Sequence, residues 1–163
     1  MNKLLLIAAL LAGFLAGPAI AQAKGVTGWL IEKREHDKYC NASRDYKDAA
    51  DENRGYAFVL TYSAERIVIV VVYEGWEWEK ARDRISVDLS TDKNDIMKKS
   101  NWEVLDKTTI RGLFAFDQKI LDGFSGAERL TVAVGDDEDD SIEVEIPQAT
   151  EMLAALKACQ EKK

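Results

Sequence analysis

The chain has 163 residues, of which 29 are acidic and 22 basic, so its formal net charge at pH 7 is −7. This length is enough for one domain with a hydrophobic core of ordinary size. The acidic excess argues against nucleic acid and against anionic lipid surfaces as partners. It favours instead a protein or another envelope component, in particular a basic one.

The first 23 residues have the features of a secretory signal peptide. Lys3 provides a short basic start, residues 4–15 form an apolar run, and Ala21 and Ala23 are small residues at cleavage spacing. The apolar run is too short for a typical membrane span, although an uncleaved anchor is the alternative. We expect cleavage after Ala23, or else after Ala21. Residues 24–163 then form a single domain with a net charge of −8, no membrane span and a periplasmic or secreted location.

The strongest strand prediction covers residues 67–73, which follow a weaker first strand at 29–34 and a polar, turn-rich connection at 44–54. Seven consecutive apolar residues at 67–73, six of them β-branched, favour a strand with both faces buried. Residues 55–62 precede it, with Tyr56, Phe58, Leu60 and Tyr62 on one side, and residues 63–66 are short enough for a hairpin turn. We expect this hairpin to be the centre of the fold.

Two tryptophans follow the hairpin at strand spacing, with glutamates beside them. Trp76 and Trp78 are expected to pack in the core, while Glu77 and Glu79 face solvent. If the two rings were exposed, these four residues would be the first candidate for a partner-binding patch.

The rest of the chain predicts short strands and two helices. Residues 82–89 alternate as a strand with one solvent face, residues 90–100 read as a polar loop, and residues 101–105 and 108–111 are weaker strands. Phe116, Ile120 and Phe124 indicate a short helix, and residues 128–135 and 141–146 a second hairpin. Pro147 then opens a last helix whose apolar stripe is Ala149, Met152, Leu153, Leu156 and Cys159.

Cys40 and Cys159 are the only cysteines of the chain, one near each end of the exported part. In an oxidising compartment such a pair predicts one disulfide bond. Two free thiols or a metal pair are the alternatives, but a zinc site would need ligands that a chain with one histidine does not offer. The fold expected is therefore mainly β, an antiparallel β-sandwich or partly open barrel, with one short helix and a C-terminal helix docked by the disulfide.

Few residues are arranged for catalysis or for holding a cofactor. A serine or cysteine nucleophile usually needs a histidine base beside it, and His36 is the only histidine. We expect His36 to be a surface residue of its charged segment, without a nucleophile to activate. The acidic run 136–140 lacks the spaced ligand pattern of a calcium loop and reads as a solvated hairpin tip. We expect no enzyme activity, cofactor or metal site.

Several features of the chain form a recognisable arrangement. They are the signal peptide, the strand led by Trp29, Cys40, the central hairpin, the helix 116–123, the strands 130–134 and 142–146, and the segment Ala154–Cys159. This arrangement resembles the invasion-associated locus B family of exported alphaproteobacterial proteins, most clearly over residues 116–159. The resemblance implies a periplasmic or surface β-rich domain without an established enzymatic activity.

Three functions are compatible with these features. The first is an exported, non-enzymatic β-domain that binds another macromolecule in the cell envelope or on a host. The second is an acidic inhibitor of a basic envelope-directed enzyme such as lysozyme. The third is a carboxylate-based hydrolase that uses Glu77 or Glu79, which would require two carboxyl groups in one pocket.

Overall fold

The computed structural model describes residues 26–33, 39–135 and 141–161, within which the chain forms nine strands and two helices. The strands are Leu30–Glu32 (β1), Asn41–Asp48 (β2), Arg54–Tyr62 (β3), Arg66–Tyr73 (β4), Arg84–Thr91 (β5), Asp95–Asp106 (β6), Thr109–Ala115 (β7), Arg129–Val134 (β8) and Ile142–Glu145 (β9). The helices are Gln118–Asp122 (α1) and Ala149–Glu161 (α2).

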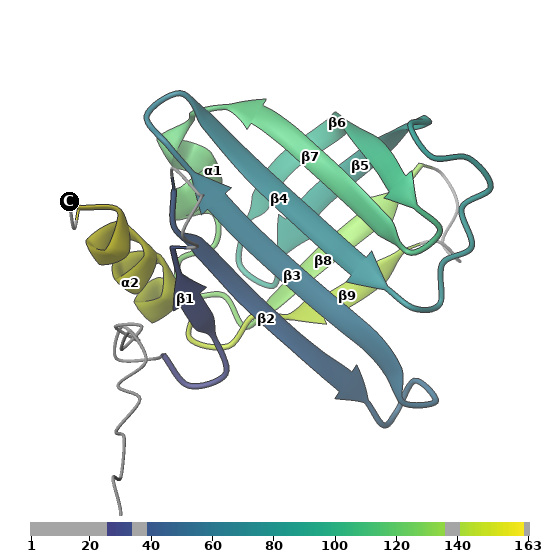
Figure 1. The fold of residues 1–163 in the computed structure, drawn as a ribbon, viewed down its shortest axis with the longest axis horizontal. Coiled ribbons are helices and arrows are strands. Elements are labelled where there is room, and N and C mark those ends of the chain that lie inside the picture. Colours follow the sequence, from purple (N-terminus) through teal and green to yellow (C-terminus); the bar gives the residue numbers. More distant parts are fainter. Residues whose placement is uncertain (1–25, 34–38, 136–140, 162–163) are drawn as a thin grey trace, which may run out of the picture.

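These strands form one antiparallel sheet in the order β1-β2-β3-β4-β7-β6-β5-β8-β9, and the sheet curls into a half-barrel (Figure 1). Side chains join β2 to β9, the strand at the far end of the order. Arg44 of β2 pairs with Glu145 of β9 at 3.1 Å, and the Glu145 backbone N–H donates to the Tyr46 hydroxyl at 2.9 Å. Trp29 Nε1 also donates to the Pro147 carbonyl oxygen at 2.7 Å. These contacts hold the curled sheet around its core where strand pairing stops.

The predicted fold class is confirmed, and a partly open barrel is the architecture that forms. Two segments that we predicted as polar connections are strands instead, namely β2 and the first half of β6. In β2 the inward positions include Arg44 and Tyr46, whose side chains end in polar groups. The sequence of β2 therefore lacks the alternation of apolar and polar residues that is typical of a strand. In β6 a register shift opposite Val87–Leu89 interrupts the two-residue period, so the pattern no longer reads as a strand.

The prediction that both faces of residues 67–73 are buried is wrong for the outer face. Ile67, Ile69 and Val71 are buried completely, while the alternate valines are half-buried. Val70 lies opposite Val59, and Val68 opposite Leu113. Branched side chains on neighbouring strands shield one another in this way without a second layer over them.

The core fills the concave side of the sheet and includes the inner face of α2. Phe58 is fully buried in this core. Its ring lies edge-on to Trp29 at 5.9 Å and is tilted against Phe124, also at 5.9 Å. Phe58 therefore links the N-terminal part of the sheet to the segment that follows α1.

Gly112 of β7 leaves room for the largest fully buried side chain, Trp102. A Cβ at residue 112 would lie 2.8 Å from Trp102 Cε2 and 2.5 Å from Phe114 Cε2. The Trp102 ring is held in place because its Nε1 donates to Ser100 Oγ at 2.9 Å. The sheet therefore needs a residue without a side chain at this position.

We expect Gly112→Ala to lower the free energy of unfolding by about 1–3 kcal/mol, the usual cost of overpacking a core. Urea denaturation of the variant and the wild type measures the difference. An unchanged denaturation midpoint would mean that the rings of Trp102 and Phe114 can move aside, contrary to the packing described here.

Asp51, in the loop between β2 and β3, organises a polar cap over one end of the core. Its Oδ2 accepts hydrogen bonds from the hydroxyls of Tyr56 and Tyr73, both at 2.8 Å, and its Oδ1 accepts one from Arg54 at 3.1 Å. The hydrogen bonds from Tyr73 and Tyr56, together with the charge of Arg54, lower the pKa of Asp51 below its ordinary value of 3.8.

This lowered pKa predicts a pH-dependent contribution to stability. A carboxyl group whose pKa is lower in the folded state stabilises the fold above its unfolded pKa, and the effect is lost as the pH falls through the folded pKa. We expect Asp51→Asn to be less stable than the wild type at pH 7, and the difference to shrink between about pH 4 and pH 2.

Urea denaturation at several pH values measures this difference, with Asp45→Asn, which changes an exposed carboxylate of β2, as the control. A difference between Asp51→Asn and the wild type that stays constant from pH 7 to pH 2 would contradict the role given to the Asp51 carboxylate.

Candidate binding groove

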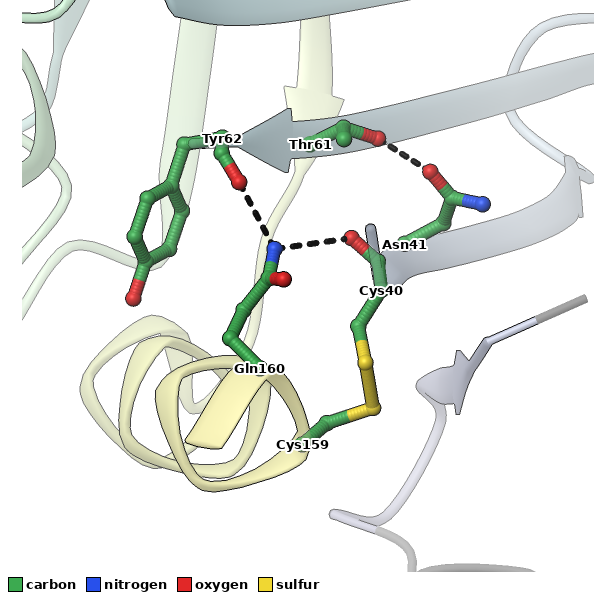
Figure 2. The surroundings of a disulfide bond; sticks show 6 residues. All are labelled: Cys40, Asn41, Thr61, Tyr62, Cys159 and Gln160. Carbon is green, nitrogen blue, oxygen red and sulfur yellow. Dashed lines mark hydrogen bonds between the residues drawn. A yellow bond between two sulfur atoms is a disulfide. The ribbon is translucent and has the colours of Figure 1, made fainter. Parts of the chain in front are cut away.

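The C-terminal helix is fixed to the sheet at its last turn. The predicted disulfide between Cys40 and Cys159 is confirmed, and it joins the residue before β2 to α2 across a sequence separation of 119 residues. The neighbouring Gln160 donates from Nε2 to the Tyr62 carbonyl oxygen at 2.7 Å and to the Cys40 carbonyl oxygen at 3.4 Å (Figure 2). The disulfide bond and the side-chain amide of Gln160, which donates to both carbonyl oxygens, therefore set the position of α2 relative to the end of β3.

A groove of about 400 Å³ lies between α1, α2 and the end of β3. Both helices sit at the same end of the sheet, near the ends of β3 and β7 (Figure 1). The apolar part of its wall is formed by Tyr62, Phe116, Leu121, Leu153 and Ala154. Phe116 is one of three large hydrophobic side chains that are exposed among the described residues, with 37% of its surface accessible.

Local structure holds Phe116 at this wall. The Phe116 backbone N–H donates to the Glu65 carbonyl oxygen at 2.9 Å, which ties the end of β7 to the turn before β4. Asp117 then caps α1, because its Oδ1 accepts the Lys119 backbone N–H at 2.9 Å. The Phe116 ring consequently lies 6.2 Å from the ring of Tyr62.

Polar groups form the rim of the groove and connect α2 to the segment that follows α1. Thr150 of α2 accepts the Gly126 backbone N–H at 2.8 Å, and its hydroxyl lies 3.3 Å from that of Ser125. On α1, Gln118 Nε2 donates to Asp122 Oδ1 at 2.8 Å. An apolar wall with a polar rim is the usual composition of a binding site.

Two charged groups of α2 lie near the groove. Burial raises the pKa of the Tyr62 phenol, and the Glu161 carboxylate raises it further. Lys157 lines the groove one helical turn before Glu161. Within the described ranges Lys157 has no ion-pair partner at salt-bridge distance.

The residues singled out in the sequence lie elsewhere. Trp76 is buried with 2% of its surface exposed, and Trp78 is half-buried in an irregular segment after β4, not in a strand. Both rings extend an aromatic row, with Trp76 5.7 Å from Tyr73 and 5.5 Å from Trp78. Glu77 and Glu79 are exposed and do not line the groove. A binding patch at these residues would require both tryptophan rings to be exposed, and Trp76 is buried. A hydrolase would require the carboxyl groups to lie in one pocket, and neither Glu77 nor Glu79 lines the groove.

Several sequence predictions fall on residues outside the described ranges. These are the signal peptide and its cleavage site, His36, and the acidic run 136–140. In the part of the chain that the structure describes, no three His, Cys, Asp or Glu side chains gather where a metal ion could bind.

Sequence reasoning did not find the groove, because its walls come from three distant segments. Leu153 lies on α2 as predicted, but Phe116, predicted in a helix over residues 116–123, precedes the cap of α1, which spans Gln118–Asp122. The helical pattern of each segment does not show that a space lies between them. The one available signal was the long apolar side chain of Phe116, which precedes the helix cap at Asp117.

Comparisons with protein-family models, with curated proteins and with solved structures found no match. The resemblance to the invasion-associated locus B family therefore stays a prediction. Neither helix of the described residues has the length and apolar character required to cross a membrane.

Proposed function

We propose that this protein is an exported, non-enzymatic β-domain that binds another macromolecule, and that the groove between α1 and α2 is the docking site. The observation that carries the proposal is the groove itself, about 400 Å³ in volume, with Phe116 exposed at its wall. Burial of an apolar side chain against a partner is favourable, and a hollow with an apolar wall and a polar rim is the usual form of a binding site.

A location outside the cytoplasm is part of the proposal. The disulfide supports it, because such bonds persist in oxidising compartments and are rare in the cytosol. The proposed location is the periplasm or the medium, which also fits the signal peptide predicted at residues 1–23.

Affinity capture from an envelope extract of the producing organism tests the docking site, using the oxidised protein in three forms. Phe116→Asp places a charge in the groove, and Leu113→Asp does the same on the outer face of the sheet, where Leu113 is 55% exposed. We expect a partner retained by the wild type and by Leu113→Asp to be lost from Phe116→Asp. Loss from Leu113→Asp alone would move the contact to the outer sheet face.

The net charge supports a second candidate function, inhibition of a basic envelope-directed enzyme such as lysozyme. A net charge of −7 steers a cationic protein towards this one at low ionic strength. A lysozyme assay at low and at moderate salt tests this function. Full lysozyme activity in the presence of micromolar protein at both salt concentrations would remove this candidate.

A further inference from the structure

Five aromatic rings form a continuous row from β2 to the segment after β4. Neighbouring ring centroids lie 4.7, 5.1, 5.5 or 5.7 Å apart along the order Tyr46, Tyr56, Tyr73, Trp76 and Trp78. The two end rings are half-buried, and the three between them are buried. Indole and phenol lose an electron more readily than any side chain without sulfur, and electrons exchange fastest between rings in contact. The row therefore joins two surface positions by rings that can each carry a one-electron oxidation.

The Asp51 carboxylate provides two rings of this row with a proton acceptor. A phenol that loses an electron becomes a strong acid and releases its hydroxyl proton. The hydroxyls of Tyr56 and Tyr73 both donate to Asp51 Oδ2 at 2.8 Å, so a carboxylate already lies where the proton must go. Asp51 is ionised at pH 7, because its pKa lies below 3.8. An electron and a proton can therefore leave either tyrosine together.

Trp78 is the tryptophan of the row that solvent can reach. Trp29, Trp76 and Trp102 have 6%, 2% and 0% of their surface exposed, whereas Trp78 is half-buried. Its Nε1 is buried and has no hydrogen-bond partner among the described residues, so its proton has no acceptor there. An oxidised indole that keeps this proton is a stronger oxidant than a phenol whose proton can leave. Electrons are therefore drawn from the two tyrosines towards Trp78.

We propose that the row is an electron-transfer route that carries a one-electron oxidation from Trp78 to Tyr73 and Tyr56. An oxidising radical from the surroundings takes one electron from Trp78 and is itself reduced. One of the two tyrosines then returns an electron to the indole through Trp76, and its phenol proton moves to Asp51. The products are a restored tryptophan, a neutral tyrosyl radical and a protonated carboxyl group.

This route ends far along β3 from the disulfide. Asp51 lies just before the start of β3, whereas the carbonyl oxygen of Tyr62, at the end of β3, accepts the Gln160 amide beside Cys159. The oxidation is thus held at the opposite end of this strand from the disulfide. None of the residues in the row lines the groove, so the inference does not depend on the proposed docking site.

Pulse radiolysis of the disulfide-bonded protein in azide solution at pH 7 tests the route. The azide radical takes one electron from accessible tryptophans in preference to other side chains, and the tryptophanyl and tyrosyl radicals are followed by their separate absorption bands. We expect the tyrosyl signal to rise as the tryptophanyl signal decays, at a rate that is independent of protein concentration. The rate should be lower in D₂O, because a proton moves with the electron.

Three variants locate the path. Trp76→Phe interrupts the row with a ring that is not readily oxidised, and it should lose the concentration-independent phase. Trp102→Phe is the same substitution at a buried ring outside the row, and it should keep this phase. Asp51→Asn retains an acceptor oxygen for the phenols but removes the base, and it should slow the rise of the tyrosyl signal. Circular dichroism confirms that each variant is folded before irradiation.

Several results would overturn the inference. A tyrosyl signal whose rate rises in proportion to protein concentration would mean that the oxidation passes between molecules. An unchanged phase in Trp76→Phe, or its loss in Trp102→Phe, would place the path elsewhere. An equal rate in D₂O and water, or a wild-type rate in Asp51→Asn, would show that no proton passes to the carboxylate. The concentration and D₂O measurements use the wild type, so they decide the inference whether or not every variant folds.

Discussion

Replacement of both cysteines, Cys40→Ala with Cys159→Ala, is expected to lower the free energy of unfolding by about 4–5 kcal/mol. The disulfide closes a loop whose ends are 119 residues apart, and the chain-entropy relation gives this value for the freedom that the unfolded chain regains. The loss would be a large fraction of the stability of a domain of this size. Guanidinium denaturation of the oxidised wild type and of the double variant measures it.

The wild type with its disulfide reduced is the matched control, because it has the same constraint removed without a change in side-chain volume. We expect it to fall within about 1 kcal/mol of the double variant. A double variant as stable as the oxidised wild type would show that α2 is held by its packing and by Gln160 alone.

The second large effect is expected for Phe58→Ala, which should lower the free energy of unfolding by about 3–5 kcal/mol. The substitution opens a cavity in the core where the ring contacts Trp29 and Phe124, so two distant parts of the chain lose their common neighbour. Urea denaturation measures the effect.

Phe116→Ala is the matched control for this experiment, since it removes the same ring from an exposed position. We expect its cost to stay below about 1 kcal/mol, as for most surface substitutions. Equal losses from the two variants would contradict the burial assigned to Phe58.

Sequence alone predicted the elements whose patterns are simple. The apolar run at 67–73, the alternation in residues 128–135 and 141–146, and the stripe of the last helix correspond to β4, β8, β9 and α2. The disulfide followed from the number of cysteines and the expected compartment. These predictions depend only on the local periodicity of apolar residues or on the number of cysteines, and the structure confirms them.

The failures share a physical cause. Arg44 and Tyr46 point towards the concave side of the sheet, and their polar ends bind Glu145 of β9, 99 or more residues away. No local sequence pattern predicts such a contact. The polar cap of Asp51 and the groove beside Phe116 likewise depend on side chains from separate segments. Periodicity identifies which face of an element is apolar, but not which other element covers that face.

We propose that a partner docks at the groove and not on the outer face of the sheet. Site-specific photocrosslinking in the producing organism distinguishes the two surfaces, with p-benzoyl-L-phenylalanine placed at position 116 or at position 113, both exposed apolar positions near the end of β7. We expect a light-dependent adduct of defined mass from position 116 and none from position 113. Adducts from position 113 alone, or from neither position, would contradict it.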